Sequence, residues 1–317
     1  MDQLNLTKEQ LELFANNRQT NLANFYELPE ELNDAVEIAL ALNQPLLITG
    51  EPGTGKTLLA DKVAADLNLI SGNQYHQKPY VFNTKSTSSY NDLFYTYDAI
   101  THFYDANIKK DKKPQLKDYI QLNALGMAIV ASMEPGEKEL VPATNLPGND
   151  VARNSVVLID EIDKAPGDFP NDLLFELEKY AFRIKENGAT EFTKNKNATI
   201  LIIITSNGEK KLPEAFLRRC IFFNIKFPEK PFLLKILEKH ALSDALNGNQ
   251  SRVLEKFAEV RELCIFKKPS TAELIAWVKI LIKNGTSLDD AAALAATLPV
   301  LVKDEGDLSI VKQKWGL

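Results

Sequence analysis

The stretch GEPGTGKT, Gly50 to Thr57, decides the fold of this chain of 317 residues. It follows the apolar run Pro45 to Ile48 and opens the helical pattern LLADKVAADL, so the local order is strand, loop, helix. Glycines let the backbone turn so that several N–H groups point at one anion, which a side chain would otherwise block. The positive end of the helix that begins there adds its dipole. The stretch therefore predicts a site for a nucleoside triphosphate.

The other residue types in this loop have predicted tasks of their own. Lys56 supplies a fixed positive charge for the β- and γ-phosphates, and Thr57 offers a hydroxyl to Mg²⁺. A glycine-rich turn that matches the pattern by chance is the alternative, and the strand before it and helix after it argue against that. The residues predicted to bind the nucleotide are Gly50, Glu51, Pro52, Gly53, Thr54, Gly55, Lys56, Thr57 and Leu58.

A second diagnostic element is SVVLIDEIDKA, Ser155 to Ala165. Its apolar run is typical of a buried strand in a parallel sheet, and ligands bind at the carboxyl end of such strands. Two acids stand at that end. Asp160 can hold Mg²⁺, and Glu161 can orient and deprotonate the attacking water. The ordinary alternative for acids after a strand is a helix N-cap, a task that Asp163 or Asp168 could serve equally well.

Two further segments follow along the chain. ATILIIIT, residues 198–205, is another buried strand, and it ends in Ser206 and Asn207. An amide at that sheet edge can hydrogen-bond both the γ-phosphate and the lytic water, so Asn207 is a candidate catalytic residue. LPEAFLRRC, residues 212–220, predicts a short helix that carries Arg218 and Arg219.

Composition limits the class of protein. Hydrophobic residues make up 44% of the chain and charged residues 25%, which is typical of a soluble globular protein. The net charge of −6 argues against a nucleic-acid binder, because phosphate contacts need a basic face. Only two cysteines are present, without metal-ligand spacing, and no apolar run approaches about 18 residues. We therefore expect a cytoplasmic protein with reduced thiols that does not enter a membrane.

Aromatic residues crowd the segment from Tyr90 to Tyr104. Large aromatic side chains more often pack in a core or an interface than bind a substrate. The run YTYDAI within this segment could form a strand of a hairpin, and a second hairpin is predicted to turn at Asn187 and Gly188.

Four segments, GEPGTGKT, VVLIDEID, IIITSN and LPEAFLRRC, occur in the order found in one family. Together they resemble the AAA+ ATPases, and LPEA with a loop-rich second half resembles the MoxR branch. The resemblance implies that Asn207 is the residue called sensor 1. It also implies that an arginine reaches the nucleotide of a neighbouring subunit, with Arg219 aligned best and Arg218 as the alternative. Asn83, at the end of the strand predicted over residues 79–84, is a candidate switch that restrains Glu161.

The fold class that this resemblance implies is α/β: a phosphate-loop NTPase with a parallel sheet flanked by helices, followed by a small all-α lid. The expected domains are an N-terminal helical extension (1–30), the nucleotide-binding domain (31–227) and the lid (228–317). Helical spacing predicts helices in the segments 4–23, 32–42, 122–133, 232–246, 272–282 and 288–302.

In the lid, the family usually places an arginine, the second sensor, where this chain has Thr271. Lys267 and Lys268 are candidate substitutes, although lysine cannot reproduce the forked guanidinium. Solvated lysines with no partner are the alternative interpretation.

The resemblance implies an ATPase that uses ATP and Mg²⁺, works as a homo-oligomeric ring with a hexamer expected, and remodels or matures a protein partner. In the MoxR branch that partner is often a protein with a von Willebrand A domain. One alternative is a nucleic-acid-directed motor, as in GTP-using AAA+ proteins, which would need a basic pore. Another is a binding switch in which the nucleotide controls a partner and turnover is incidental.

Overall fold

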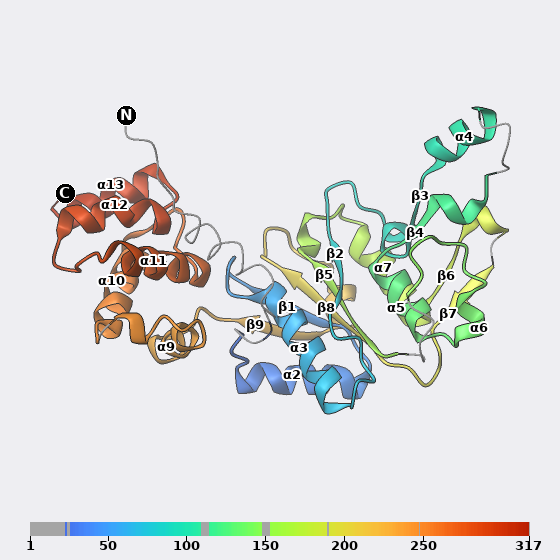
Figure 1. Cartoon of the computed structure of the whole chain (residues 1–317), viewed down its shortest axis with the longest axis horizontal. Helices are drawn as coiled ribbons and strands as arrows, with labels where there is room; N and C mark the ends of the chain where they lie inside the picture. The colour runs from blue at the N-terminus through green and yellow to red at the C-terminus, as the bar shows by residue number, and fades with distance from the viewer. Residues whose placement is uncertain are drawn as a thin grey trace.

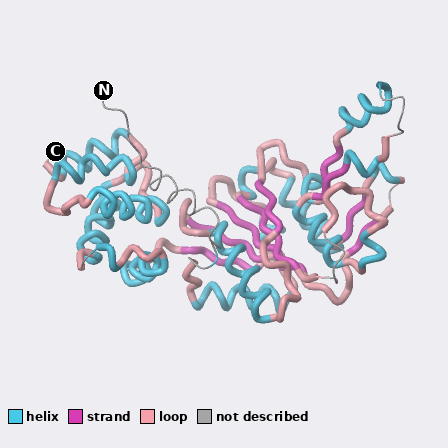
Figure 2. Tube along the Cα trace, viewed as in Figure 1, coloured by secondary structure: helices cyan, strands magenta, loops and turns pink. Residues whose placement is uncertain are grey.

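A five-stranded parallel sheet forms the centre of the fold (Figures 1 and 2). The computed structural model describes residues 23, 26–108, 114–147, 153–188, 190–246 and 248–316, without the side chains of residues 174–176 and 178. In spatial order the strands are β2 (Tyr80–Asn83), β5 (Ser155–Asp160), β8 (Ile200–Ser206), β1 (Leu46–Gly50) and β9 (Ile221–Ile225). All neighbours are parallel, so the carboxyl ends of β1, β5 and β8 meet at one edge.

The central strands are buried on both faces, which explains their continuous apolar sequence. Side chains alternate between the faces along each strand. In β5, Val156 and Leu158 pack on one side, and Val157 and Ile159 pack on the other. The predicted parallel sheet flanked by helices is therefore confirmed.

In the described part of the chain, two helices cover each face of the sheet. On one face lie α2 (Glu30–Leu42) and α3 (Lys56–Ile70), and on the other lie α5 (Ala124–Ser132) and α7 (Phe169–Lys179). Helix α2 buries residues with helical spacing and ends at Leu42. The next residue, Asn43, has a left-handed backbone, which is common directly after a helix. The predicted helix 122–133 begins later than expected, because Leu122 still belongs to a strand.

An irregular region connects β2 to β5. It contains η2 (Tyr90–Leu93), β3 (Tyr95–Tyr97), α4 (Ala99–Ile108), η3 (Leu116–Tyr119), β4 (Ile120–Leu122) and α6 (Pro135–Lys138). Strand β3 pairs with β4, antiparallel, across α4, so the predicted hairpin exists but is not a tight one. Figure 1 shows α4 at the end of the molecule opposite α10 to α13.

A second hairpin follows α7 and joins β6 (Ala181–Arg183) to β7 (Glu191–Thr193). A 3-10 turn, η5 (Lys185–Asn187), leads to Gly188 at φ +69°, so the predicted turn position is correct although the loop is longer than two residues. Further along the chain, α8 (Glu214–Leu217) precedes β9.

The C-terminal segment is all helical and has a core of its own around the fully buried Trp277. Its elements are α9 (Lys230–Lys239), η6 (Asp244–Leu246), α10 (Gln250–Leu263), α11 (Thr271–Asn284), α12 (Ala291–Leu301) and α13 (Glu305–Lys314). The single helix predicted over 232–246 is wrong: Ala241 has φ +54°, which ends α9 and separates η6. Helices α10 and α13 were not predicted.

The predicted N-terminal helix 4–23 lies outside the described residues except for Ala23. The domain boundaries at 30 and 227 stay predictions. Across the described ranges, no helix combines the length and the apolar composition needed to cross a membrane.

Candidate active site

The loop between β1 and α3 has the conformation that its glycines predict. Gly53 and Gly55 have φ +74° and +88°, values that side-chain-bearing residues rarely adopt. Neighbours also exclude a side chain there, because a Cβ on Gly55 would lie 2.8 Å from the Tyr26 ring and one on Gly53 would overlap Ser270. The loop is therefore shaped by its own backbone and enclosed by residues from distant segments.

Lys56 lies across the inside of this loop. Its Nζ donates hydrogen bonds to the carbonyl oxygens of Gly50 (2.8 Å) and Glu51 (2.9 Å), and only 6% of the residue is exposed. Burial lowers the pKa of the Lys56 ammonium, while the nearby carboxylates, led by Asp160, act in the opposite direction. A positive charge is thus held where α3 begins.

Thr57 and Asp160, the two predicted metal ligands, lie together. The Thr57 hydroxyl is 3.2 Å from Oδ1 and 3.1 Å from Oδ2 of Asp160, although 103 residues separate them. Asp160 Oδ1 also accepts a hydrogen bond of 2.5 Å from the buried hydroxyl of Thr205. A hydroxyl and a carboxylate are hard oxygen ligands of the type that Mg²⁺ takes, so this pair fits a magnesium ion.

Glu161 has both carboxylate oxygens engaged. Oε1 accepts a hydrogen bond of 3.0 Å from Asn207 Nδ2, and Oε2 pairs with Lys164, an interaction that raises the pKa of Lys164. The backbone of Glu161 is left-handed (φ +56°), and its N–H donates to Thr205 Oγ1 at 2.8 Å. In the described part of the chain, Asn83 is not a hydrogen-bond partner of the Glu161 carboxylate, so the structure does not support the proposed Asn83 switch.

Thr205 was not among the predicted site residues, although it contacts both acids. The sequence does carry a signal for it, because Thr205 and Ser206 are polar residues at the end of the otherwise apolar strand β8, next to β5. Asp163, proposed as an ordinary helix cap, instead accepts hydrogen bonds from the loop that follows β8.

The two candidate arginines follow α8 at the protein surface. Arg218 pairs with Glu214 at 3.8 Å with 82% of its side chain exposed, and Arg219 is exposed as well. Surface exposure is compatible with a contact to a second subunit, but the role of both arginines stays a prediction.

A residue of the helical segment reaches the phosphate loop, and it is none of those predicted. Arg261 of α10 donates to Glu51 at 2.8 Å and to the Pro269 carbonyl at 2.5 Å, and its guanidinium lies 3.4 Å from the ring centroid of Phe227. No local pattern reveals this contact, because 210 residues separate Arg261 from Glu51.

The residues predicted for the second sensor lie nearby. Lys267 and Lys268 are exposed, whereas Thr271 is buried at the start of α11, with an Oγ1 that has no hydrogen-bond partner among the described residues. That Lys267 or Lys268 takes the role of the second-sensor arginine stays a prediction.

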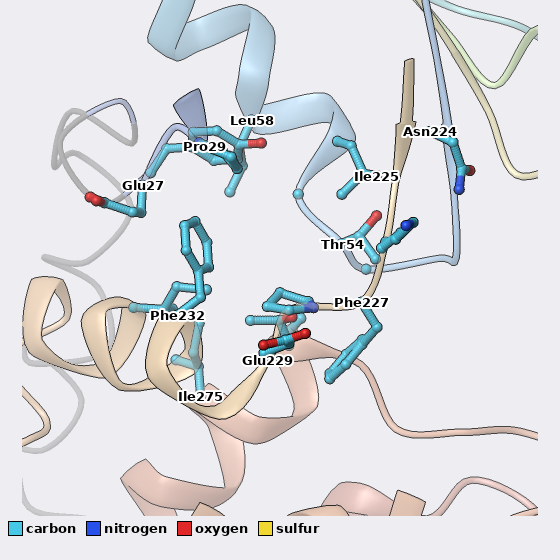
Figure 3. Close-up of a pocket in the computed structure, with 18 of the residues that line it drawn as sticks. Glu27, Pro29, Thr54, Leu58, Asn224, Ile225, Phe227, Glu229, Phe232 and Ile275 are labelled. Carbon is cyan, nitrogen blue, oxygen red and sulfur yellow. The ribbon is translucent and has the colours of Figure 1, made fainter. Parts of the chain in front are cut away.

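A cavity of about 500 Å³ adjoins the loop. Figure 3 shows Leu58 and Pro29 on one side of it, and Phe232 and Ile275 of the C-terminal helices on another. Apolar walls beside a phosphate loop suit the flat ring of a nucleobase, since small-molecule sites are mostly apolar with a few polar groups. The site thus combines an anion loop, a metal-ligand pair, a carboxylate held by an amide, and an apolar pocket.

Comparison with known proteins places these features in context. The family model described as "AAA domain (dynein-related subfamily)" matches residues 45–220, more than half of the chain. No curated protein matches the sequence. Two similar solved structures each share 16% sequence identity with this chain. A point variant of RuvB from Thermotoga maritima has a TM-score of 0.45, covering 89% of this chain and 70% of that one. The AAA domain of FIGL-1 in complex with ADP has a TM-score of 0.43, covering 99% of each chain.

Proposed function

This chain belongs to the family of AAA domains, dynein-related subfamily, and is an ATPase; we propose that it is a Mg²⁺-dependent enzyme of the MoxR branch that works as an oligomeric ring on a protein partner. The observation that carries the proposal is the meeting of residues from three separate motifs. Thr57 contacts Asp160, and Asn207 contacts Glu161, at the carboxyl edge of the sheet.

The residues of this site would divide the work of hydrolysis as follows. The N–H groups of the glycine loop and Lys56 bind the phosphates, and the apolar pocket holds the nucleobase. Thr57 and Asp160 would hold Mg²⁺, which when bound neutralises charge on the phosphate oxygens. Glu161 accepts the proton of the attacking water, and Asn207 keeps that carboxylate in place.

Lys164 opposes this role of Glu161 in the structure as it stands. The Lys164 ammonium occupies Oε2 of Glu161, and Asn207 occupies Oε1, so neither oxygen is open to the attacking water. We infer that Glu161 acts as a base only when it turns away from Lys164, whose side chain is 44% exposed and therefore has room to move.

The ring proposal assigns the arginine that completes each site to the neighbouring subunit. Arg219 is the first candidate and Arg218 the second, and a hexamer is the expected assembly. We also propose that residues 31–227 form the nucleotide-binding domain and residues 228–317 the lid. The contacts of Arg261 with Glu51, and of Ser270 with the Gly53 region, support a lid that responds to the loop.

A protein partner is favoured over nucleic acid by the surface of α4. The crowded aromatic segment divides into two parts: Phe94 and Tyr95 are buried, whereas Phe103 and Tyr104 are 74% and 58% exposed. Ile100 is 84% exposed on the same helix. Exposed apolar side chains together with the acidic composition suit a polypeptide better than a phosphate backbone.

The client is tested with a trapping variant. Glu161→Gln protein should bind ATP without hydrolysing it, so the ATP-bound form should persist and a protein client should co-purify with it in the presence of ATP. Lys56→Ala is the control, because a form that cannot bind ATP should retain less of that client. Stimulation of ATP hydrolysis by DNA or RNA, lost on raising the salt concentration, would favour the motor instead. Client binding that follows nucleotide without any turnover in the parent protein would favour the switch.

A further inference from the structure

Asp163 joins the two turns that carry the acids and the amide. It lies in the short 3-10 helix η4 (Ile162–Lys164), and only 2% of it is exposed. Its Oδ2 accepts hydrogen bonds from the backbone N–H groups of Asn207 (3.1 Å) and Glu209 (2.9 Å), which belong to the loop after β8. The carboxylate thus ties the turn after β5 to the turn after β8.

Gly208 makes this double contact possible. It lies between the two donors with φ +77°, and a Cβ on it would meet nothing within 4 Å. Glycine is therefore required here for its conformation and not for space, since that conformation brings the N–H groups on both sides to one oxygen.

Hydrogen bonds compensate only part of the buried Asp163 carboxylate. Its second oxygen, Oδ1, is buried and has no hydrogen-bond partner among the described residues. Burying a carboxylate is unfavourable unless hydrogen bonds compensate it, so an aspartate is a poor choice for a merely structural loop cap. Charge-assisted bonds to two N–H groups, however, hold a loop more firmly than neutral ones do.

The loop that Asp163 holds is the one that positions Glu161. Asp163 binds the backbone of Asn207, and the side chain of Asn207 donates to Glu161 Oε1 at 3.0 Å. The left-handed backbone of Glu161 is strained, and such strain persists only where the surroundings hold it. Asp163 and Glu161 belong to the same turn after β5, and Asn207 contacts both of them, through its backbone N–H and its side-chain amide respectively.

We propose that Asp163 is a positioning residue for ATP hydrolysis: it fixes the backbone of Asn207 so that the Asn207 amide aims the Glu161 carboxylate at the attacking water. This proposal rests on the function proposed above. The proposed function assigns Asp163 no contact with phosphate or metal. Its loss should therefore slow turnover and leave nucleotide affinity nearly unchanged.

The first test is Asp163→Asn, which keeps the shape but removes the charge. We expect kcat to fall by about 10- to 100-fold, as small misplacements of reacting groups do, with the Kd for ATP from calorimetry within about 3-fold of the parent. The double variant with Asn207→Ala should be at most about 2-fold slower than Asn207→Ala alone, since both changes act through one contact. A parent-like kcat, or losses that simply multiply, would overturn the proposal.

The second test approaches the same loop from the other side. Gly208→Ala strains the loop without touching Asp163, and it should lower kcat with little change in ATP affinity. Gly188→Ala is the matched control, because Gly188 has φ +69° and open space around it but lies in the β6–β7 hairpin. Gly188→Ala should keep the parent kcat. If Gly208→Ala lowers only the melting temperature while kcat per folded molecule is unchanged, the clamp is merely structural and the proposal fails.

Two variants distinguish a failure of the proposed function from a failure of the role of Asp163. A Glu161→Gln variant that still hydrolyses ATP would contradict the proposed function itself. An inactive Glu161→Gln together with a fully active Asp163→Asn would contradict only the role of Asp163.

Discussion

Thr205→Val should damage both stability and hydrolysis, although it changes no residue predicted to touch ATP. Thr205 is fully buried, and its hydroxyl donates to Asp160 Oδ1 (2.5 Å) and accepts from the Glu161 N–H (2.8 Å). Valine has nearly the same shape and suits a strand, so packing is preserved. The substitution therefore isolates the hydroxyl.

The expected size of the effect follows from these two bonds. A hydrogen bond to a charged group contributes about 1.5–3 kcal/mol, and an unsatisfied, partly buried N–H costs about 1 kcal/mol. The free energy of unfolding should therefore fall by about 2.5–4 kcal/mol. Because Asp160 and Glu161 both lose an anchor, kcat should fall by about 10- to 100-fold.

The assay compares urea unfolding and ATP turnover with those of a matched variant. Thr297 is also buried, and its hydroxyl accepts from Trp277 Nε1 and donates to the Leu294 carbonyl, both at 2.8 Å, within the C-terminal helices. Thr297→Val should cost stability of similar size but leave kcat per folded molecule near that of the parent. The reasoning is refuted if Thr205→Val unfolds at the same urea concentration as the parent and hydrolyses ATP at the same rate.

Three further predictions concern the assembly, the pH dependence and the thiols. If Arg219 acts on the neighbouring subunit, Arg219→Ala should bind ATP normally while its kcat falls by about 10³- to 10⁵-fold. Mixing this variant with Lys56→Ala should restore some activity that rises with protein concentration, and normal hydrolysis by Arg219→Ala would exclude Arg219 from this role. Burial, aided by the charge of Lys279, lowers the pKa of His240 in the folded chain. Neutral His240 therefore stabilises the fold fully above the unfolded pKa of about 6.5, and this contribution is lost as the pH falls below that value. His240→Gln should weaken the decline in unfolding free energy between about pH 7.5 and 5.5, and a decline identical to that of the parent would contradict this role of His240. Burial raises the pKa of the Cys220 thiol to about 12, so a thiol reagent at mildly alkaline pH should label it slowly in the native protein and rapidly in guanidinium, and equal rates would contradict its burial.

The parallel sheet and the proximity of Thr57, Asp160 and Asn207 could be predicted because both depend on local signals in the sequence. An apolar run gives a buried strand, and in a parallel sheet the carboxyl ends of strands share one edge. That is why Thr57, Asp160 and Asn207 could be expected near one another although they come from three distant motifs. Thr205 was within reach of the same reasoning, but its hydroxyl was not considered.

Other contacts depend on packing that no local pattern encodes. Arg261 contacts Glu51 only because the C-terminal helices pack against the loop, and α10 was not among the predicted helices. That helix buries Val253, Phe257 and Val260 at helical spacing, but charged residues between them obscured the pattern. The task of Asp163 likewise requires knowing where the loop after β8 turns back.

The central claim is that Lys56 binds the nucleotide while Glu161 acts on water, and calorimetric titration of ATP into two variants tests it most directly. Lys56→Ala should lose most of its affinity for ATP. Glu161→Gln should bind ATP as the parent does, and neither variant should show turnover. Normal ATP binding by Lys56→Ala, or hydrolysis at the parent rate by Glu161→Gln, would contradict the account.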